Sequence, residues 1–168
     1  PIANGGTGAT TLAGAGLANT PNFSAYSSAT QTGLASGGWT KIQFDTELFD
    51  SDSAYDNTND KFVVPAGEGG KYFFTSSAKI NSATSGGTTT LLGSGLTFYV
   101  NGANVAEIVN FYATGVFSAD GMNFTTVISL SATDYVEVYA YYQDNGGGTG
   151  DITGGSGKDT LFSGYKLI

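Results

Sequence analysis

The feature that most constrains this chain is a succession of short apolar runs, each ended by a turn signal of Gly, Asn or Asp. The runs fall at 22–31, 39–49, 61–64, 70–80, 89–100, 104–113, 122–131, 134–143 and 159–168. Their lengths are typical of strands, and nothing in the chain shows a capped helical stripe of period 3.6. The sequence therefore predicts an all-β fold of about eight to ten strands, arranged as a sandwich or a barrel.

One turn is predicted in detail. Asn101-Gly102 separates the apolar runs 89–100 and 104–113. Both central residues of a type I′ turn need a positive φ, and Asn-Gly adopts that conformation readily. We therefore expect a tight hairpin at this position.

The chain divides into two regions of different composition. Residues 1–20, PIANGGTGATTLAGAGLANT, contain only three large aliphatic residues, Ile2, Leu12 and Leu17, and cannot form a core of their own. Beyond Pro21 the chain is rich in aromatic and β-favouring residues. We predict a Gly-rich connector at 1–20 and a single head domain at 21–168.

Charge and hydropathy exclude several partners. Fourteen acidic residues against six basic ones give a net charge of −8, which repels nucleic acid and anionic lipid surfaces. No apolar run approaches the roughly 20 residues that cross a bilayer, so membrane insertion is not expected. Abundant Gly, Ser, Thr and Asn, together with Tyr, suit neutral partners such as sugars.

The residue types needed for catalysis are scarce. The chain has no His and no Cys, which removes the commonest general base and the thiol nucleophile. Glu137 is the one carboxylate in an aromatic context, and a structural hydrogen bond to Tyr or Lys is its expected role. We predict that the protein is not an enzyme and needs no cofactor.

Acidic residues crowd the window 45–60. Two interpretations stay open, turns closed by Asp side chains and a calcium site, with the turns favoured because the EF-hand order is absent. The residues concerned are Asp45, Glu47, Asp50, Asp52, Asp56 and Asp60.

The segment DYVEVYAYY alternates strictly. Val136, Val138 and Ala140 are predicted to face the core, while the other side of the strand carries Tyr135, Glu137, Tyr139 and Tyr141. Three tyrosines in register suit a partly hydrated protein interface, so this face is predicted to contact another subunit. Scattered surface tyrosines are the alternative.

Several segments resemble a known family in their order along the chain. FSAYSSATQTG, WTKIQFDTELFD, KFVVPAGEGGKYFF, LTFYVNGANV, ATDYVEVYAYY and TLFSGYKLI are similar to the globular head of complement component one, subcomponent q. That family shares its trimeric jelly roll with tumour-necrosis-factor-like cytokines. In the family pattern Phe62, Pro65, Tyr72 and Phe74 fall around a Pro–Gly turn, and Gly164 lets an aromatic ring press close.

The resemblance implies a homotrimeric jelly-roll β-sandwich. We expect Tyr72 and Phe74 to join Tyr135, Glu137, Tyr139 and Tyr141 in the trimer interface. Binding is expected in the loops 82–95, 114–121 and 145–157, of which 82–95 and 145–157 look inserted relative to the family. The residues predicted to contact a receptor are Thr88, Thr89, Asn145, Thr149 and Asp151.

Residues 3–12, ANGGTGATTL, resemble a short motif of bacteriophage tail-fibre and virion fibre proteins. This resemblance implies a fibre head on the virion exterior that binds a host surface glycan or protein. Its other partners would be further copies of the chain and other fibre or tail proteins. The alternative is a structural cap that trimerises a fibre without binding a receptor.

Overall fold

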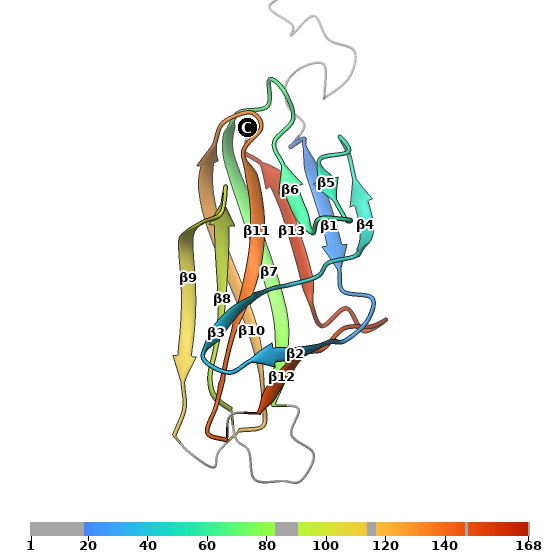
Figure 1. The fold of residues 1–168 in the computed structure, drawn as a ribbon. Coiled ribbons are helices and arrows are strands. Elements are labelled where there is room, and N and C mark those ends of the chain that lie inside the picture. The colour runs from blue at the N-terminus through green and yellow to red at the C-terminus, as the bar shows by residue number, and fades with distance from the viewer. Residues whose placement is uncertain (1–18, 83–90, 114–116, 147, 168) are drawn as a thin grey trace, which may run out of the picture.

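Two antiparallel β-sheets pack face to face. This computed structural model describes residues 19–82, 91–113, 117–146 and 148–167, in which seven strands form one sheet and six the other (Figure 1). Sheet A runs in the order β2 (Gln31–Ala35), β12 (Thr149–Ile152), β7 (Gly70–Ser82), β13 (Leu161–Lys166), β1 (Asn22–Tyr26) and β4 (Thr46–Asp50), with β10 (Ala119–Leu130) on the other side of β7. Sheet B runs in the order β5 (Tyr55–Asp56), β6 (Lys61–Val63), β11 (Tyr135–Asp144), β8 (Leu91–Val100) and β9 (Ala103–Phe111), with β3 (Gly38–Lys41) also beside β11. The predicted all-β sandwich is confirmed.

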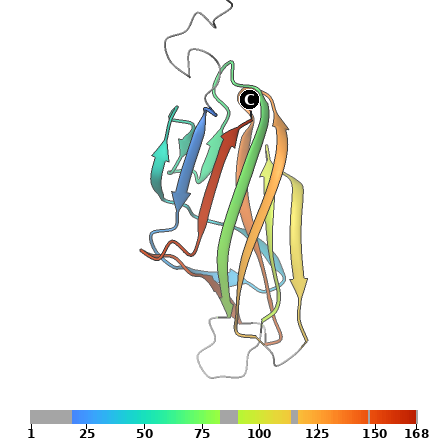
Figure 2. The same cartoon turned by 180° about the vertical axis from the view of Figure 1, so that it is seen from behind.

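The two longest strands, β7 and β10, lie side by side in sheet A. β10 pairs with β7 along its whole length, from Ala119 opposite Asn81 to Leu130 opposite Gly70, and the view from behind shows the pair side by side (Figure 2). β13 pairs with the other side of β7 and with β1. Because β1 and β13 are antiparallel, the first and last described residues lie at the same end of the molecule (Figure 1).

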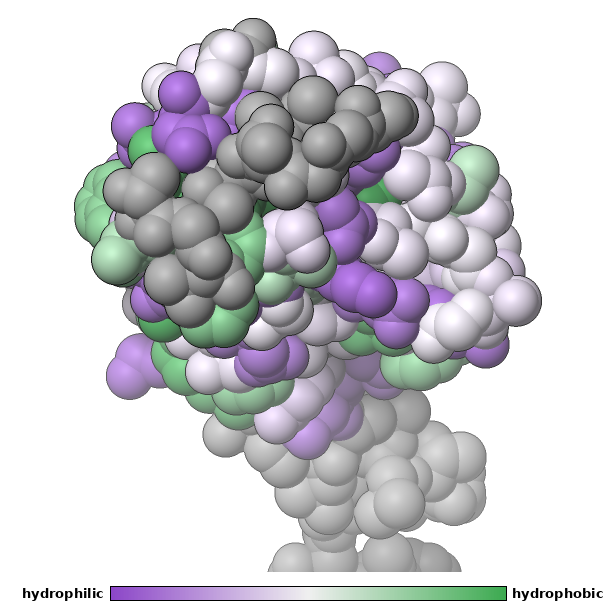
Figure 3. All heavy atoms as spheres, turned by 90° about the horizontal axis from the view of Figure 1, so that it is seen from below, coloured by the Kyte–Doolittle hydropathy of each residue, from purple (hydrophilic) through white to green (hydrophobic). Residues whose placement is uncertain are grey.

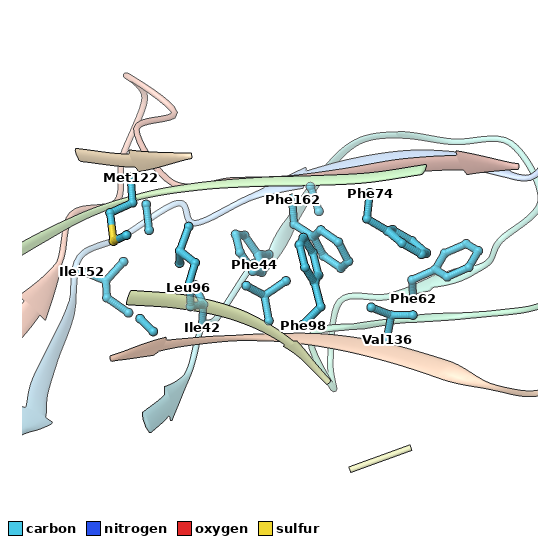
Figure 4. Packing of buried hydrophobic residues seen from close by; sticks show 14 of the residues in the cluster. Ile42, Phe44, Phe62, Phe74, Leu96, Phe98, Met122, Val136, Ile152 and Phe162 are labelled. Atoms are coloured by element: carbon cyan, nitrogen blue, oxygen red, sulfur yellow. The ribbon is translucent and has the colours of Figure 1, made fainter. Parts of the chain in front are cut away.

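Aromatic rings fill the space between the sheets at one end of the core. The ring of Phe162 lies 4.8 Å from Phe23, 5.9 Å from Phe74 and 6.0 Å from Phe98, measured between centroids. Aliphatic side chains such as Leu96 and Ile152 continue the core toward the other end (Figure 4). Phe162 and Phe74 come from sheet A and Phe98 from sheet B, so the rings join the two layers.

Gly164 makes this ring packing possible. A Cβ atom built on Gly164 would lie 2.5 Å from Cδ1 of Phe74 and 3.0 Å from Cε1 of Phe23. No side chain fits there, because carbon atoms in contact need about 3.5–4.0 Å. The expected close approach of an aromatic ring to this glycine is confirmed.

The hairpin at Asn101-Gly102 is also confirmed. Asn101 has a φ of 51° and Gly102 a φ of 80°, as a type I′ turn requires. The turn joins β8 to β9 and sets their register, with Val100 opposite Ala103.

Two predicted strands are each divided in the structure. In the run 22–31, the Ser27 amide still donates to the Thr160 carbonyl in the register of β13, but the next amide, of Ser28, donates to Asp45 Oδ1, and the chain leaves the ladder there. The run 39–49 crosses from sheet B to sheet A between β3 and β4, and Ile42 and Phe44 of the crossing are fully buried. The apolar pattern therefore continues through a segment that is not a strand.

Replacing Gly164 by Ala should destabilise the domain. The added methyl group must displace the Phe74 ring, so we expect the free energy of unfolding to fall by about 1–3 kcal/mol in chemical denaturation. Gly38→Ala is the control, because a Cβ there meets only the Ala35 carbonyl oxygen at 3.7 Å. Equal stability of the two variants would contradict this account of the core.

Candidate interaction surfaces

The outer face of sheet B carries the predicted tyrosines. Val136, Val138 and Ala140 are buried, whereas the alternating residues of β11 are half-buried. The predicted alternation is thus confirmed. We call the residues Tyr135, Glu137, Tyr139 and Tyr141 the tyrosine face, and its role as a subunit interface stays a prediction.

Glu137 is held by hydrogen bonds on this face. Its Oε1 atom accepts from Lys41 Nζ at 2.7 Å, and its Oε2 atom accepts from Tyr139 Oη at 3.4 Å. Lys41 also donates to the Asn59 carbonyl at 2.6 Å. Burial, with the neighbouring Glu137 carboxylate, raises the pKa of Tyr139 above its usual value. The predicted hydrogen bonding of Glu137 to Lys and Tyr is confirmed.

A row of three aromatic rings crosses the same sheet. The Tyr141 ring lies 5.3 Å from Trp39 and 6.3 Å from Phe111, measured between centroids. Trp39 stands opposite Tyr141 in β3, and Phe111 stands opposite Gly93 at the far side of β8. We call Trp39, Tyr141 and Phe111 the aromatic strip. Only Tyr141 was predicted, because the strand register that brings in the other two is not visible in their local sequence.

The outer face of sheet A is uncharged over two rows of side chains. One row crosses three strands with Val127, Phe73 and Tyr165, and the next row consists of small hydroxyl side chains. We call these two rows the sheet A face; its members are Val127, Phe73, Tyr165, Thr125, Thr75, Ser163 and Ser24. Small side chains let a neighbouring molecule approach the sheet closely.

A hollow of about 380 Å³ lies at the end of this face near β1 and β13. It is lined by Asn19, Asn22, Phe23, Phe49, Ser163, Gly164 and Tyr165. The hollow exists because Ser163 has only a small side chain beside the larger Phe49 and Tyr165, while the absent Cβ of Gly164 points the other way, into the core.

Among the described strands, no hydrogen-bonded ladder joins β9 of sheet B to β10 of sheet A. Each is the outermost strand of its sheet among the described residues. Ile108 is 37% exposed and Val105 is 48% exposed, and Phe117 just before β10 is also 48% exposed. Seen from the end away from the chain termini, hydrophobic residues reach the surface on the side where β9 lies (Figure 3). We call this region the β9–β10 edge.

Two predicted interface residues are wrong. Tyr72 and Phe74 point into the core and are fully buried within a single copy, so they cannot contact another subunit. Burial and the nearby Glu68 carboxylate raise the pKa of Tyr72 to about 12, and its hydroxyl donates to the Glu68 carbonyl at 2.5 Å. Because side chains alternate along a strand, Phe73 takes the outward position instead.

The predicted binding loops are only partly loops. Thr149 and Asp151 belong to β12, which pairs with β2 and with the end of β7. Asn145 lies in the exposed turn after β11. Thr88 and Thr89 lie outside the described residues. The strand was missed because glycines surround its four residues.

The acidic window forms turns. Asp50 Oδ1 accepts from the Asp52 amide at 3.3 Å, and Asp56 Oδ1 accepts from the Thr58 amide at 3.2 Å, which are Asx turns. The side-chain hydrogen bond from Asn59 helps to hold the pKa of Asp56 below its usual value. Across the described ranges, no group of three or more potential ligands is placed to hold a metal ion.

The part of the chain that the structure describes contains no helix that could span a membrane.

Comparisons with known proteins agree with this fold. The globular domain of zebrafish complement 1qA protein matches with a TM-score of 0.59 at 14% identity, over 89% of this chain and 98% of that chain. Murine APRIL, crystallised at pH 5.0, matches with a TM-score of 0.57 at 12% identity, over 87% of this chain and 98% of that chain. A search of curated proteins gives no match.

These likenesses show that the two-sheet sandwich is the jelly roll predicted from the sequence. The family model of the C1q domain matches residues 23–167, which is nearly the whole described chain. The chain therefore belongs to the C1q domain family.

Proposed function

We propose that this domain assembles as a homotrimer and acts as a head that binds a partner on a cell surface. Domains of its family are non-catalytic, and they typically form trimeric globular heads that bind partners. The observation that carries the proposal is the presence of two different surfaces on one domain, the uncharged sheet A face and the β9–β10 edge with its exposed apolar residues.

Two different surfaces that cover each other make a heterologous contact. Such a contact closes into a ring when the rotation between copies allows it. We place the β9–β10 edge of one copy against the sheet A face of the next. The hollow beside Phe49 and Tyr165 is large enough to receive apolar side chains of that edge.

Exposure supports this arrangement. Val127 is 54% exposed on the sheet A face, and within the described ranges no strand pairs with the outer side of the nine-residue β9. A long, apolar edge strand left open promotes aggregation, so covering it with another copy stabilises the domain. A solitary copy would leave both surfaces in water.

The position of the chain ends supports an outward binding surface. The described ends lie together, so three copies around one axis would have their six ends at one end of the assembly. The opposite end and the outer face of sheet B then point away from that attachment. A partner would meet these surfaces in three copies at once, which raises its apparent affinity.

One pair of variants distinguishes the proposed contact on the sheet A face from the contact on the tyrosine face that the sequence predicts. Val127→Asp should leave the fold of one copy intact, because the side chain is half in water, but it would bury a charge in the proposed contact. We expect this variant to sediment as a single copy at micromolar concentration, while Tyr139→Ser stays trimeric. The reverse result would move the contact to the tyrosine face.

The place of the head in a virion fibre is a separate part of the proposal. It rests on ANGGTGATTL at 3–12, which lies outside the described residues. In this proposal the trimer sits on the virion exterior and contacts a host surface glycan or protein. A structural cap with no receptor is the alternative.

Cell binding separates these two roles. Purified trimer, added to a panel of bacterial strains, should adsorb to susceptible cells and reduce infection by the intact particle. Val127→Asp, as a single copy, should compete much less well because it loses multivalency. If the trimer adsorbs to no strain while its deletion stops fibre assembly, the domain is a cap.

A further inference from the structure

We propose that the aromatic strip of Trp39, Tyr141 and Phe111 binds a neutral carbohydrate chain. This inference rests on the proposed head function, for which it names the class of partner and the site. The argument uses the shape of the strip, its exposure and the charges beside it.

The strip lies on a floor made by two glycines of β8. A Cβ on Gly95 would be 3.0 Å from Cη2 of Trp39, and a Cβ on Gly93 would be 3.1 Å from Cε1 of Tyr141 and 3.2 Å from Cδ1 of Phe111. Any larger residue would push the rings off the sheet. The glycines therefore let all three rings rest low on the sheet in one row. The Trp39 and Tyr141 planes meet at 54° and the Tyr141 and Phe111 planes at 73°, so each ring would offer its own face or edge to a sugar unit.

The rings remain accessible. Phe111 is 71% exposed, the largest value among the large hydrophobic residues that the structure describes, and Trp39 and Tyr141 are half-buried. Ring faces carry partial negative charge and attract the C–H groups on one side of a sugar ring. Centroid separations of 5.3 and 6.3 Å are comparable to the repeat of consecutive pyranose rings.

Charge around the strip favours a neutral partner. Tyr141 Oη donates to Gln143 Oε1 at 2.9 Å, so an uncharged amide lies at the edge of the strip. The ion pair of Lys41 with Glu137 on the same face is closed at 2.7 Å, and Glu107 of β9 adds a negative charge that accepts from the Asn104 amide. A chain of net charge −8 repels anionic polysaccharides, whereas hydroxyl groups can bond to tyrosine and amide edges.

The position of the strip on the domain also suits binding to a partner outside the trimer. It lies on the outer face of sheet B, whereas the proposed trimer contact uses the free edge of β9 and β10; Phe111, the last residue of β9, is the strip residue that belongs to that strand. Three strips on one head would bind a repeating surface polysaccharide more tightly than one strip alone.

The experiment uses Trp39, the one tryptophan of the chain, as its reporter. Trimer is titrated with neutral hexasaccharides of β-1,4-glucose, α-1,4-glucose and β-1,4-N-acetylglucosamine, and Trp39 emission is followed beside calorimetry. At least one of them should give a saturable change in both signals.

Phe111→Ser should weaken binding about tenfold, because one ring stack is lost. Leu48→Ser is the matched control, since Leu48 is 46% exposed on β4 and belongs to none of the surfaces discussed; it should bind as the unaltered chain does.

Three outcomes overturn the inference. The first is that none of the three sugars changes either signal, and the second is that Phe111→Ser and Leu48→Ser bind equally. The third is that Phe111→Ser alters the oligomeric state, which would make a second copy the occupant.

If the trimer adheres to cells and Phe111→Ser adheres equally, the proposed sugar binding by the strip is wrong while the head function stands. If sugars bind but the trimer adheres to no cell, the head function fails instead.

Discussion

The whole structure depends on aromatic rings that meet between two sheets. Phe162, Phe74 and Phe23 from sheet A pack against Phe98 and Phe62 from sheet B, and each ring removes a large apolar area from water. The chain has no disulfide to hold the layers together, since it contains no Cys. Gly164 is therefore as important as the rings, because its missing side chain lets two of them approach the sheet.

Much of this fold could be predicted from local sequence. Turn residues at Asn101-Gly102 and strict alternation in β11 depend only on neighbouring residues, and both predictions were confirmed. The strands that were missed or merged depend on distant contacts. β12 exists because Gly150, Asp151 and Ile152 find partners in β7 and β2, and the crossing at Ile42 to Phe44 looks like a strand because its side chains are buried.

The surfaces were harder to predict than the fold. Alternation shows that two sets of residues lie on opposite faces, but it does not show which face is inside. In YFF both candidate faces are aromatic, so alternation alone does not reveal that Phe73 points outward while Tyr72 and Phe74 point into the core. The aromatic strip joins residues from β3, β11 and β9, and only the register of β8 between them brings them into one row.

The adjacency of the first and last strands has a further consequence. Asn22 pairs with Tyr165, so the domain begins and finishes at neighbouring points of one sheet. A unit with this geometry can be exchanged between carriers, or inserted into a loop of another protein, with little disturbance of either host or guest. Variation in the far loops and on the outer sheet can then alter what is recognised while the point of attachment stays the same.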